Sequence, residues 1–161
     1  MTKYILSVIL VLLGVLSCTK DVQIDLPQLP PQLVVDGNIE AGAHPLVLLS
    51  MSQPAADTVS LLTYLNSMVS DAQVTVVNGA DTFELSPTYI QQLPLESQKR
   101  VAVMLRVELE EVVLLPIQVY STPALYGVAN QTYELCIAHQ GKTFKGSTYL
   151  PNPCSLDSLY W

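Results

Sequence analysis

Basic residues are scarce in this chain. Its 161 residues include seven Lys and Arg against fourteen Asp and Glu. The single basic cluster, Lys99, Arg100 and Arg106, is followed at once by the acidic segment 108–111. Because nucleic-acid binding needs clustered basic side chains to neutralise phosphates, the composition excludes nucleic acid as a partner. The same acidity argues against adsorption to anionic lipid headgroups.

Long hydrophobic runs are also rare, and the one present lies near the amino terminus, at residues 5–16. Spanning the hydrocarbon takes ~20 apolar residues. This run is shorter and is soon followed by Asp21, which argues against a transmembrane anchor. Lys3 before the run and the small Ser17 after it are typical of a secretory signal peptide. We therefore expect residues 1–17 to be a cleaved leader that carries no fold information.

Cys18 stands directly after that leader. The ending Val15-Leu16-Ser17-Cys18 resembles the lipobox of bacterial lipoproteins. The resemblance implies that the Cys18 thiol carries a diacylglycerol and that the new amino terminus is acylated, so the protein contacts the membrane through a lipid anchor alone. Several acyl chains hold a protein almost permanently, at ~0.8 kcal/mol per buried methylene. The alternative is a signal peptide without a lipid, with Cys18 as an ordinary thiol.

Cysteines are few, and Cys136 and Cys154 are the pair that remains. An even pair in an oxidising compartment indicates a candidate disulfide. The bridge would close a loop of 17 intervening residues and contribute ~3 kcal/mol in the chain-entropy model. The alternative is one buried and one exposed thiol. Two cysteines are too few for a cysteine-only metal site, and His44 and His139 are distant in sequence, so we expect no metal and no cofactor.

Residues 18–31 contain three prolines and no regular apolar period. This composition predicts an extended, semi-rigid tether that holds the domain some tens of ångströms from the bilayer, at ~3.1 Å per residue. The alternative is a first edge strand over Val22–Leu26.

From residue 32 to residue 150 the pattern is that of short β-strands separated by turns. Strands and hairpins are expected at these residues: 33–39, 46–51, 73–85 and 132–149. Residues 53–71 are irregular, and we favour a long loop there over a helical turn within 60–69. Many short strands separated by turns predict an all-β domain of the β-sandwich type, which the chain leaves through an exit segment at 151–161.

The segment 99–120 is the least clear part of this pattern. A helix across 96–111 is conceivable from its Glu, Lys and Arg content. The apolar residues at positions 101, 103, 105, 107 and 109, however, alternate with other positions, which is the strand period. We therefore favour strands in 99–120.

Motifs that carry catalytic chemistry are missing from the sequence. Ser17 and Lys20 have the spacing of penicillin-binding enzymes, but Ser17 leaves with the leader. Gly141-Lys142-Thr143 resembles the end of a phosphate-binding loop, yet Cys136 replaces the required glycine and no helix pattern follows. We find no carboxylate pair and no nucleophile beside a recognisable base, so we expect that the protein is not an enzyme.

Several stretches together carry a resemblance to a known family. They are Pro31–Ile39 shortly after the lipobox, Gln131–Leu135, Gly141–Phe144, and Asp157-Ser158-Leu159 after a proline-rich exit. These are similar to DUF4249, a family of Bacteroidota outer-membrane lipoproteins of unknown function. The resemblance implies an N-terminal immunoglobulin-like or transthyretin-like β domain, which this chain contains, and a longer C-terminal part that would begin at 151–161.

Members of that family are often encoded near TonB-dependent outer-membrane transporters. The resemblance therefore implies a non-catalytic accessory protein of the outer membrane, docked to such a β-barrel transporter or to another envelope complex, on the periplasmic or the cell-surface face. The alternative is a ligand-capturing or adhesive lipoprotein, either glycan-binding or fimbrial. Glycan capture uses exposed aromatic side chains, and the tyrosines considered for it are Tyr64, Tyr89, Tyr120 and Tyr126.

Overall fold

The structure is a computed structural model that describes residues 30–54 and 60–153. The expected leader, nearly all of the tether with its alternative strand Val22–Leu26, and exit residues 154–161 lie outside the described residues. Among the described residues, no helix combines the length and the apolar character that crossing a membrane requires.

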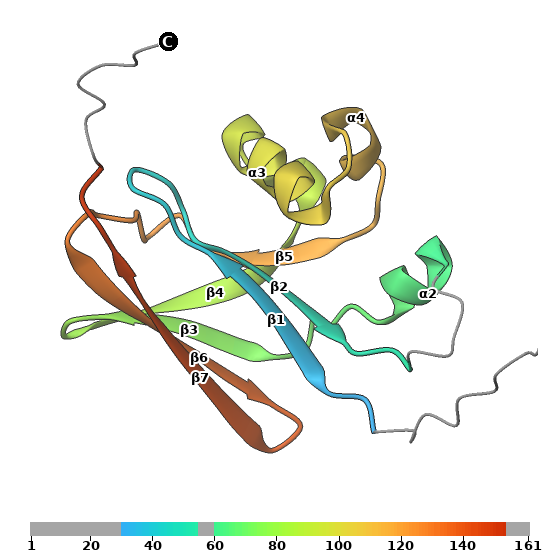
Figure 1. The fold of residues 1–161 in the computed structure, drawn as a ribbon, viewed down its shortest axis with the longest axis horizontal. Coiled ribbons are helices and arrows are strands. Elements are labelled where there is room, and N and C mark those ends of the chain that lie inside the picture. Colours follow the sequence, from blue (N-terminus) through green and yellow to red (C-terminus); the bar gives the residue numbers. More distant parts are fainter. Residues whose placement is uncertain (1–29, 55–59, 154–161) are drawn as a thin grey trace, which may run out of the picture.

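The described part of the chain is built mainly from β-strands. The elements in chain order are β1 (Leu33–Asn38), β2 (Leu46–Met51), α2 (Leu61–Asn66), β3 (Gln73–Asn78), β4 (Asp81–Tyr89), the 3-10 helix η1 (Ile90–Gln92), α3 (Leu95–Leu105), α4 (Leu109–Val112), β5 (Gln118–Ser121), β6 (Gln131–His139) and β7 (Lys142–Leu150). The strands form one antiparallel seven-stranded sheet in the order β1-β2-β5-β4-β3-β6-β7. The expected all-β class is confirmed, with a few helices added (Figure 1).

Strand β4 makes the sheet curl. Its first half, Asp81–Leu85, pairs with β3, and its second half, Ser86–Tyr89, pairs with β5. Because one strand changes partner along its length, β1 and β2 are carried across the face of β3, β6 and β7 (Figure 1). Strands β1 and β7 end the strand order and are the two edges of the sheet.

Both hairpins expected from the sequence are confirmed. In the β3–β4 hairpin Asn78 pairs with Asp81, and Gly79 supplies the positive φ of 62° that a two-residue turn requires. In the β6–β7 hairpin His139 pairs with Lys142 across Gln140 and Gly141, whose φ values are 48° and 74°. These connections are local, so the sequence pattern alone is enough to locate them.

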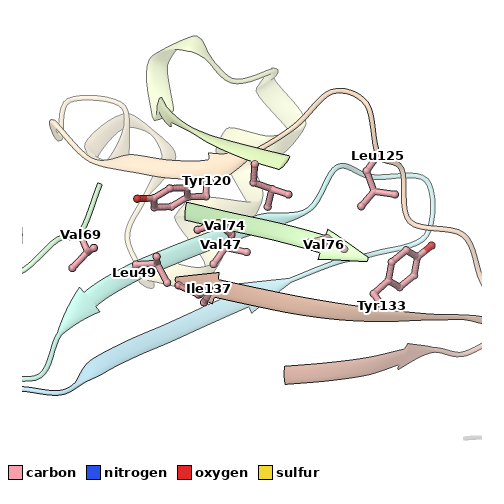
Figure 2. Packing of buried hydrophobic residues seen from close by; sticks show 10 residues of the cluster. Val47, Leu49, Val69, Val74, Val76, Tyr120, Leu125, Tyr133 and Ile137 are labelled. Atoms are coloured by element: carbon pink, nitrogen blue, oxygen red, sulfur yellow. The ribbon is translucent and has the colours of Figure 1, made fainter. Parts of the chain in front are cut away.

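Strand β2 is buried on both of its faces, which explains its unbroken apolar sequence. Val47 and Leu49 pack into a first core with Tyr120 and residues of β3 and β6, part of which Figure 2 shows. Leu46 and Leu48 point the other way, into a second core under the helices. The sheet segment β1-β2-β5 is therefore sandwiched between the β3-β6-β7 half and the helical layer.

Gly127 permits a close backbone approach between two segments far apart in sequence. Gly127 forms a β-bridge with Ala41 in the turn after β1. Gly42 N donates a hydrogen bond to Gly127 O at 2.8 Å, and Gly127 N donates one to Ala43 O at 2.9 Å. A Cβ at position 127 would overlap the carbonyl of Glu40. Only glycine therefore lets the segment before β6 lie against the β1–β2 connection.

The strands favoured in 99–120 are wrong for most of that segment. Residues of α3 and α4 occupy it, and only β5 is extended. The strand prediction failed because it took every apolar residue in the alternation to be buried. Val101 and its neighbour Ala102 are both buried, whereas Val103 is 78% exposed, so burial follows a helix face and not an alternation.

Local signals for α3 are present in the sequence. Pro94 occupies the N-cap position, the first turns hold helix-forming Glu, Gln, Lys and Arg, and Arg106 ends the helix with a left-handed φ of 55°. The long loop favoured at 53–71 is also wrong for α2, which Ser60 caps by accepting a hydrogen bond from Thr63 N at 3.1 Å.

Candidate functional site

Of the cysteines singled out from the sequence, the structure places Cys136. Cys18 and Cys154 lie outside the described residues, so lipidation and the disulfide stay predictions. Cys136 sits on the outer face of β6, half-buried, between Thr75 of β3 and Lys145 of β7. Its thiol donates to Glu134 Oε1 at 3.3 Å.

A small charged cluster surrounds this thiol. Lys145 Nζ donates to Glu134 Oε1 at 2.9 Å. The hydrogen bonds from Lys145 and from Cys136 lower the pKa of Glu134, and the Glu134 contact raises the pKa of Lys145. Burial, and then the bond to Glu134, raises the pKa of the Cys136 thiol. A raised thiol pKa reduces the thiolate fraction, which makes Cys136 a slow nucleophile and argues against a reactive role.

The register limits how a Cys136–Cys154 bridge can form. Leu150, the last residue of β7, pairs with Gln131, which lies five residues from Cys136 along β6. That separation is roughly 17 Å at ~3.4 Å per residue. Residues 151–154 would therefore have to run straight back along the outside of β7 to bring the two thiols together.

The two histidines are each held by structural contacts. The Nδ1 atom of His44 lies 3.0 Å from Leu125 O, and its ring lies 4.0 Å from the ring of Tyr126. His139 is buried, with Nε2 at 3.2 Å from Asp71 Oδ1. Within the described residues, no group of three or more His, Cys, Asp or Glu side chains converges as metal ligands would.

The tyrosines considered as glycan platforms divide into buried and exposed members. Tyr120 is fully buried, and its hydroxyl accepts a hydrogen bond from Ala72 N at 2.9 Å, so it presents no platform. Tyr64 packs partly buried against the second core. Tyr89 and Tyr126 are exposed, at 45% and 55%. The set therefore does not gather into one aromatic surface.

The sequence analysis missed a group of exposed apolar residues on the helical layer. Each is more than half exposed, and together we call them the helical face: Leu61 and Leu62 of α2, Leu95 and Val103 of α3, and Leu114 after α4. All three helices pack on the second core, with α3 and α4 side by side and α2 apart from them (Figure 1). Leu95 and Val103 are eight residues apart, the spacing of one helix side.

Acidic residues lie on two of the helices that carry the helical face. Glu108, Glu110 and Glu111 are exposed at and beside α4, next to Leu114. On α3, Glu96 is exposed and pairs with Lys99 at 2.8 Å. The helical layer thus presents large apolar side chains among negative charges.

Arg100 fixes the helical layer on the sheet. It lies on α3 with its side chain only 15% exposed. One terminal nitrogen, Nη1, donates to His44 O at 2.8 Å, and the other donates to Asn38 Oδ1. Its Nε lies 3.3 Å from Glu40 Oε1, without hydrogen-bond alignment. Through these contacts α3 is held at the β1–β2 connection.

The chain matches a known family over most of its length. The family model described as "Domain of unknown function (DUF4249)" matches residues 19–161. No curated protein and no solved structure matches the chain.

Proposed function

The chain belongs to the DUF4249 family, and from that premise we propose that it is a non-catalytic, lipid-anchored accessory protein of the bacterial outer membrane. In this proposal the partner is an outer-membrane β-barrel transporter of the TonB-dependent class, and the organism that makes the protein is a member of the Bacteroidota. The fold type proposed is an immunoglobulin-like or transthyretin-like sandwich. Supporting this type, the β1–β2 pair packs across β3 and β6 through one shared core.

The anchor is the first part of the proposal that can be tested. Replacing Cys18 by serine is expected to abolish incorporation of a labelled fatty acid into the protein, because the thiol is the acceptor of the diacylglycerol. The full-length chain should also shift from the membrane pellet to the soluble fraction. Cys136→Ser is the matched control and should label like the wild type. Equal labelling of Cys18→Ser and wild type would refute lipidation.

The helical face is the observation that carries the docking proposal. Five large apolar side chains there are between 56% and 81% exposed. Fully burying one such side chain is worth roughly 1.5–3 kcal/mol. The protein gains this free energy when the helical face is buried against a neighbouring protein of the membrane. This gain favours a docking role for the helical face.

Charge substitutions in this face are expected to release the partner. With Val103→Glu and Leu114→Glu combined, recovery of the β-barrel transporter from detergent-solubilised outer membranes should fall at least about tenfold, since ~1.4 kcal/mol of lost binding is tenfold. Both positions are about four-fifths exposed, so the fold should tolerate the change. The measurement is the stoichiometry of transporter co-purified with the tagged full-length chain.

Val128→Glu is the matched control for this experiment. Val128 is 54% exposed and lies in the connection before β6, outside the helices. This variant should recover as much transporter as the wild type. Equal recovery with all variants would place the contact elsewhere, and a monomer that binds glycans without a transporter would favour the ligand-capturing alternative.

A further inference from the structure

The two edge strands of the sheet border a common apolar cavity. Its volume is about 210 Å³, and it opens to solvent. Gly37 of β1 lies on one side of it, Gly146 of β7 lies on the other, and Val47, Tyr133 and Leu135 contribute to its lining. The residues that line the cavity, all of them in the described part of the chain, include no charged side chain. We call this opening between β1 and β7 the seam.

The backbone requires glycine on neither side of the seam. Gly37 pairs with Val47 and Gly146 pairs with Leu135 in unbroken ladders, so neither glycine marks a bulge, and neither has a positive φ. A Cβ at position 37 would come no closer than 3.6 Å to another residue, and a Cβ at position 146 would meet no atom within 4 Å. Glycine inside a strand costs roughly 0.5–1 kcal/mol relative to alanine. Where no bulge or bend explains it, such a glycine is typical of a place where a ligand or another backbone approaches closely.

The size and the lining of the cavity limit what it can take. Sites for drug-sized ligands enclose roughly 300–1,000 Å³, whereas an apolar cavity of about 150 Å³ takes one benzene ring. The seam, at about 210 Å³, therefore has room for a single large apolar side chain. A charged group would find no ion-pair partner in its lining. The group that enters the cavity is therefore neutral and apolar.

The backbone of β1 supplies hydrogen-bonding groups beside the cavity. Ser52 N donates to Gln32 O at 2.8 Å, so residue 32 is directed to β2. Because this direction alternates along an antiparallel strand, Leu33, Val35 and Gly37 direct their N–H and C=O groups away from β2. Such a row is a template for one more strand. An extended peptide is the ligand whose own backbone groups match it.

The side chains also favour β1 over β7 as the edge that binds. Val35 and Leu49 are opposite each other in register and share the face of the first core. Leu49 is 1% exposed, whereas Val35 is 38% exposed, so the core face of β1 is incompletely covered. Strand β7 carries Lys142 and Lys145, and lysines on an edge strand discourage pairing. Strand β1 contains no basic residue.

Asp36 defines the charge that a partner strand has to match. It lies between Val35 and Gly37 on β1, is exposed, and faces away from the cavity. The ion pairs found among the described residues do not include it. A basic residue directly opposite Asp36 would form a cross-strand ion pair. The net charge of −7 likewise favours a basic over an acidic partner segment.

We infer that the free edge of β1 binds an extended segment of another protein as an additional antiparallel strand. The register sets its pattern: a large apolar residue opposite Gly37, a basic residue opposite Asp36 and a second apolar residue opposite Val35. The first apolar side chain fills the cavity, and the second covers Val35. Main-chain hydrogen bonds to β1 supply affinity, and the cavity supplies specificity. The inference goes beyond the proposed function and does not use the helical face.

A blocked synthetic peptide, acetyl-Thr-Phe-Lys-Val-Thr-Val-amide, tests the binding mode on the full-length, processed protein in detergent. Its Phe, Lys and first Val correspond to the positions opposite Gly37, Asp36 and Val35. At saturation the peptide should slow amide hydrogen exchange at Val35 and Gly37 at least about tenfold. N-methylation of the first Val, whose N–H faces β1, should weaken binding at least about tenfold. N-methylation of the Lys, whose N–H faces away from β1, is the matched control and should leave binding unchanged.

Substitutions in β1 separate the cavity from the charge. Gly37→Val places a side chain in the cavity and should weaken peptide binding at least about tenfold, whereas Val34→Thr, on the opposite face of the same strand, should not change it. Asp36→Lys should weaken binding of the Lys peptide, and a peptide with Glu in place of Lys should restore it. The Val103→Glu, Leu114→Glu variant should bind the peptide like the wild type, because the helical face is not involved.

Several results would overturn the inference. They are unchanged exchange at Val35 and Gly37 with millimolar peptide, equal loss of binding with both N-methylated peptides, and new protection at Ser147 of β7 in place of Gly37. Slow exchange at Val35 and Gly37 before any peptide is added would also overturn it. In that case the edge is already paired, either by a segment of the same chain or by a second copy, and an intramolecular or a dimeric cross-link at Val35→Cys would show which.

Discussion

Replacing Tyr120 by alanine is expected to lower the free energy of unfolding by about 4 kcal/mol. Tyr120 is the largest fully buried side chain among the described residues. It sits on β5 between β2 and β4, opposite Val47 on one side and Pro87 on the other. Its removal leaves a cavity in the first core and an unpaired amide at Ala72. Urea unfolding followed by far-ultraviolet circular dichroism gives the value.

Two control variants separate packing from hydrogen bonding at this position. Tyr120→Phe keeps the ring and loses only the bond from Ala72 N, so its cost should be about 1 kcal/mol. Tyr89→Ala removes a tyrosine that is 45% exposed and should change stability by no more than about 0.5 kcal/mol. A cost for Tyr120→Ala no larger than that for Tyr89→Ala would contradict the burial of Tyr120.

The Tyr120 hydroxyl also adds a pH dependence. Burial raises its pKa above the ordinary value, the hydrogen bond from Ala72 lowers it in part, and Asp71 raises it. Because the folded-state pKa is the higher one, this contribution is complete below the unfolded pKa of ~10 and is lost as the pH rises through the folded pKa. Tyr120→Phe should therefore lose less stability than the wild type in strongly alkaline solution.

The hairpins could be predicted from sequence because everything that fixes them is local. Asn78 pairs with Asp81, and His139 pairs with Lys142, each pair across a two-residue turn. Each turn contains a glycine, Gly79 or Gly141, that can be recognised in the sequence. The strand order could not be predicted in the same way. The pairing of β4 with β5 and the seam between β1 and β7 depend on contacts that no short sequence window contains.

The helical face was missed for a different physical reason. In segment 99–120, the alternating apolar residues at positions 101, 103, 105, 107 and 109 indicate strands if every apolar side chain points inward. In the structure Val103 and Leu114 are exposed, so apolar character and burial do not coincide in this segment. Where a chain keeps apolar residues on its surface, periodicity arguments fail.

Arg100→Met is expected to lower the free energy of unfolding by about 3 kcal/mol. The guanidinium spans from α3 to His44 O and Asn38 Oδ1, which are 56 and 62 residues away in sequence. Methionine retains the apolar stem but leaves both acceptors without their donor. The cost should be measurable by urea unfolding, and amide exchange in α3 should rise more than exchange in β3 or β6.

A substitution of Glu40 shows whether the ion pair or the hydrogen bonds of Arg100 account for its contribution to stability. Glu40 is 55% exposed, and its contact with Arg100 Nε at 3.3 Å is not aligned as a hydrogen bond. Glu40→Gln should therefore cost less than about 1 kcal/mol. Arg100→Lys should stay close to Arg100→Met, because a single ammonium cannot reach two divergent acceptors as the planar fork does. If Glu40→Gln proved as costly as Arg100→Met, the ion pair would be the important contact. Arg100 holds α3 against the sheet, so its loss should also loosen the helical face. If that face is the docking surface that we propose, recovery of the transporter should fall as well.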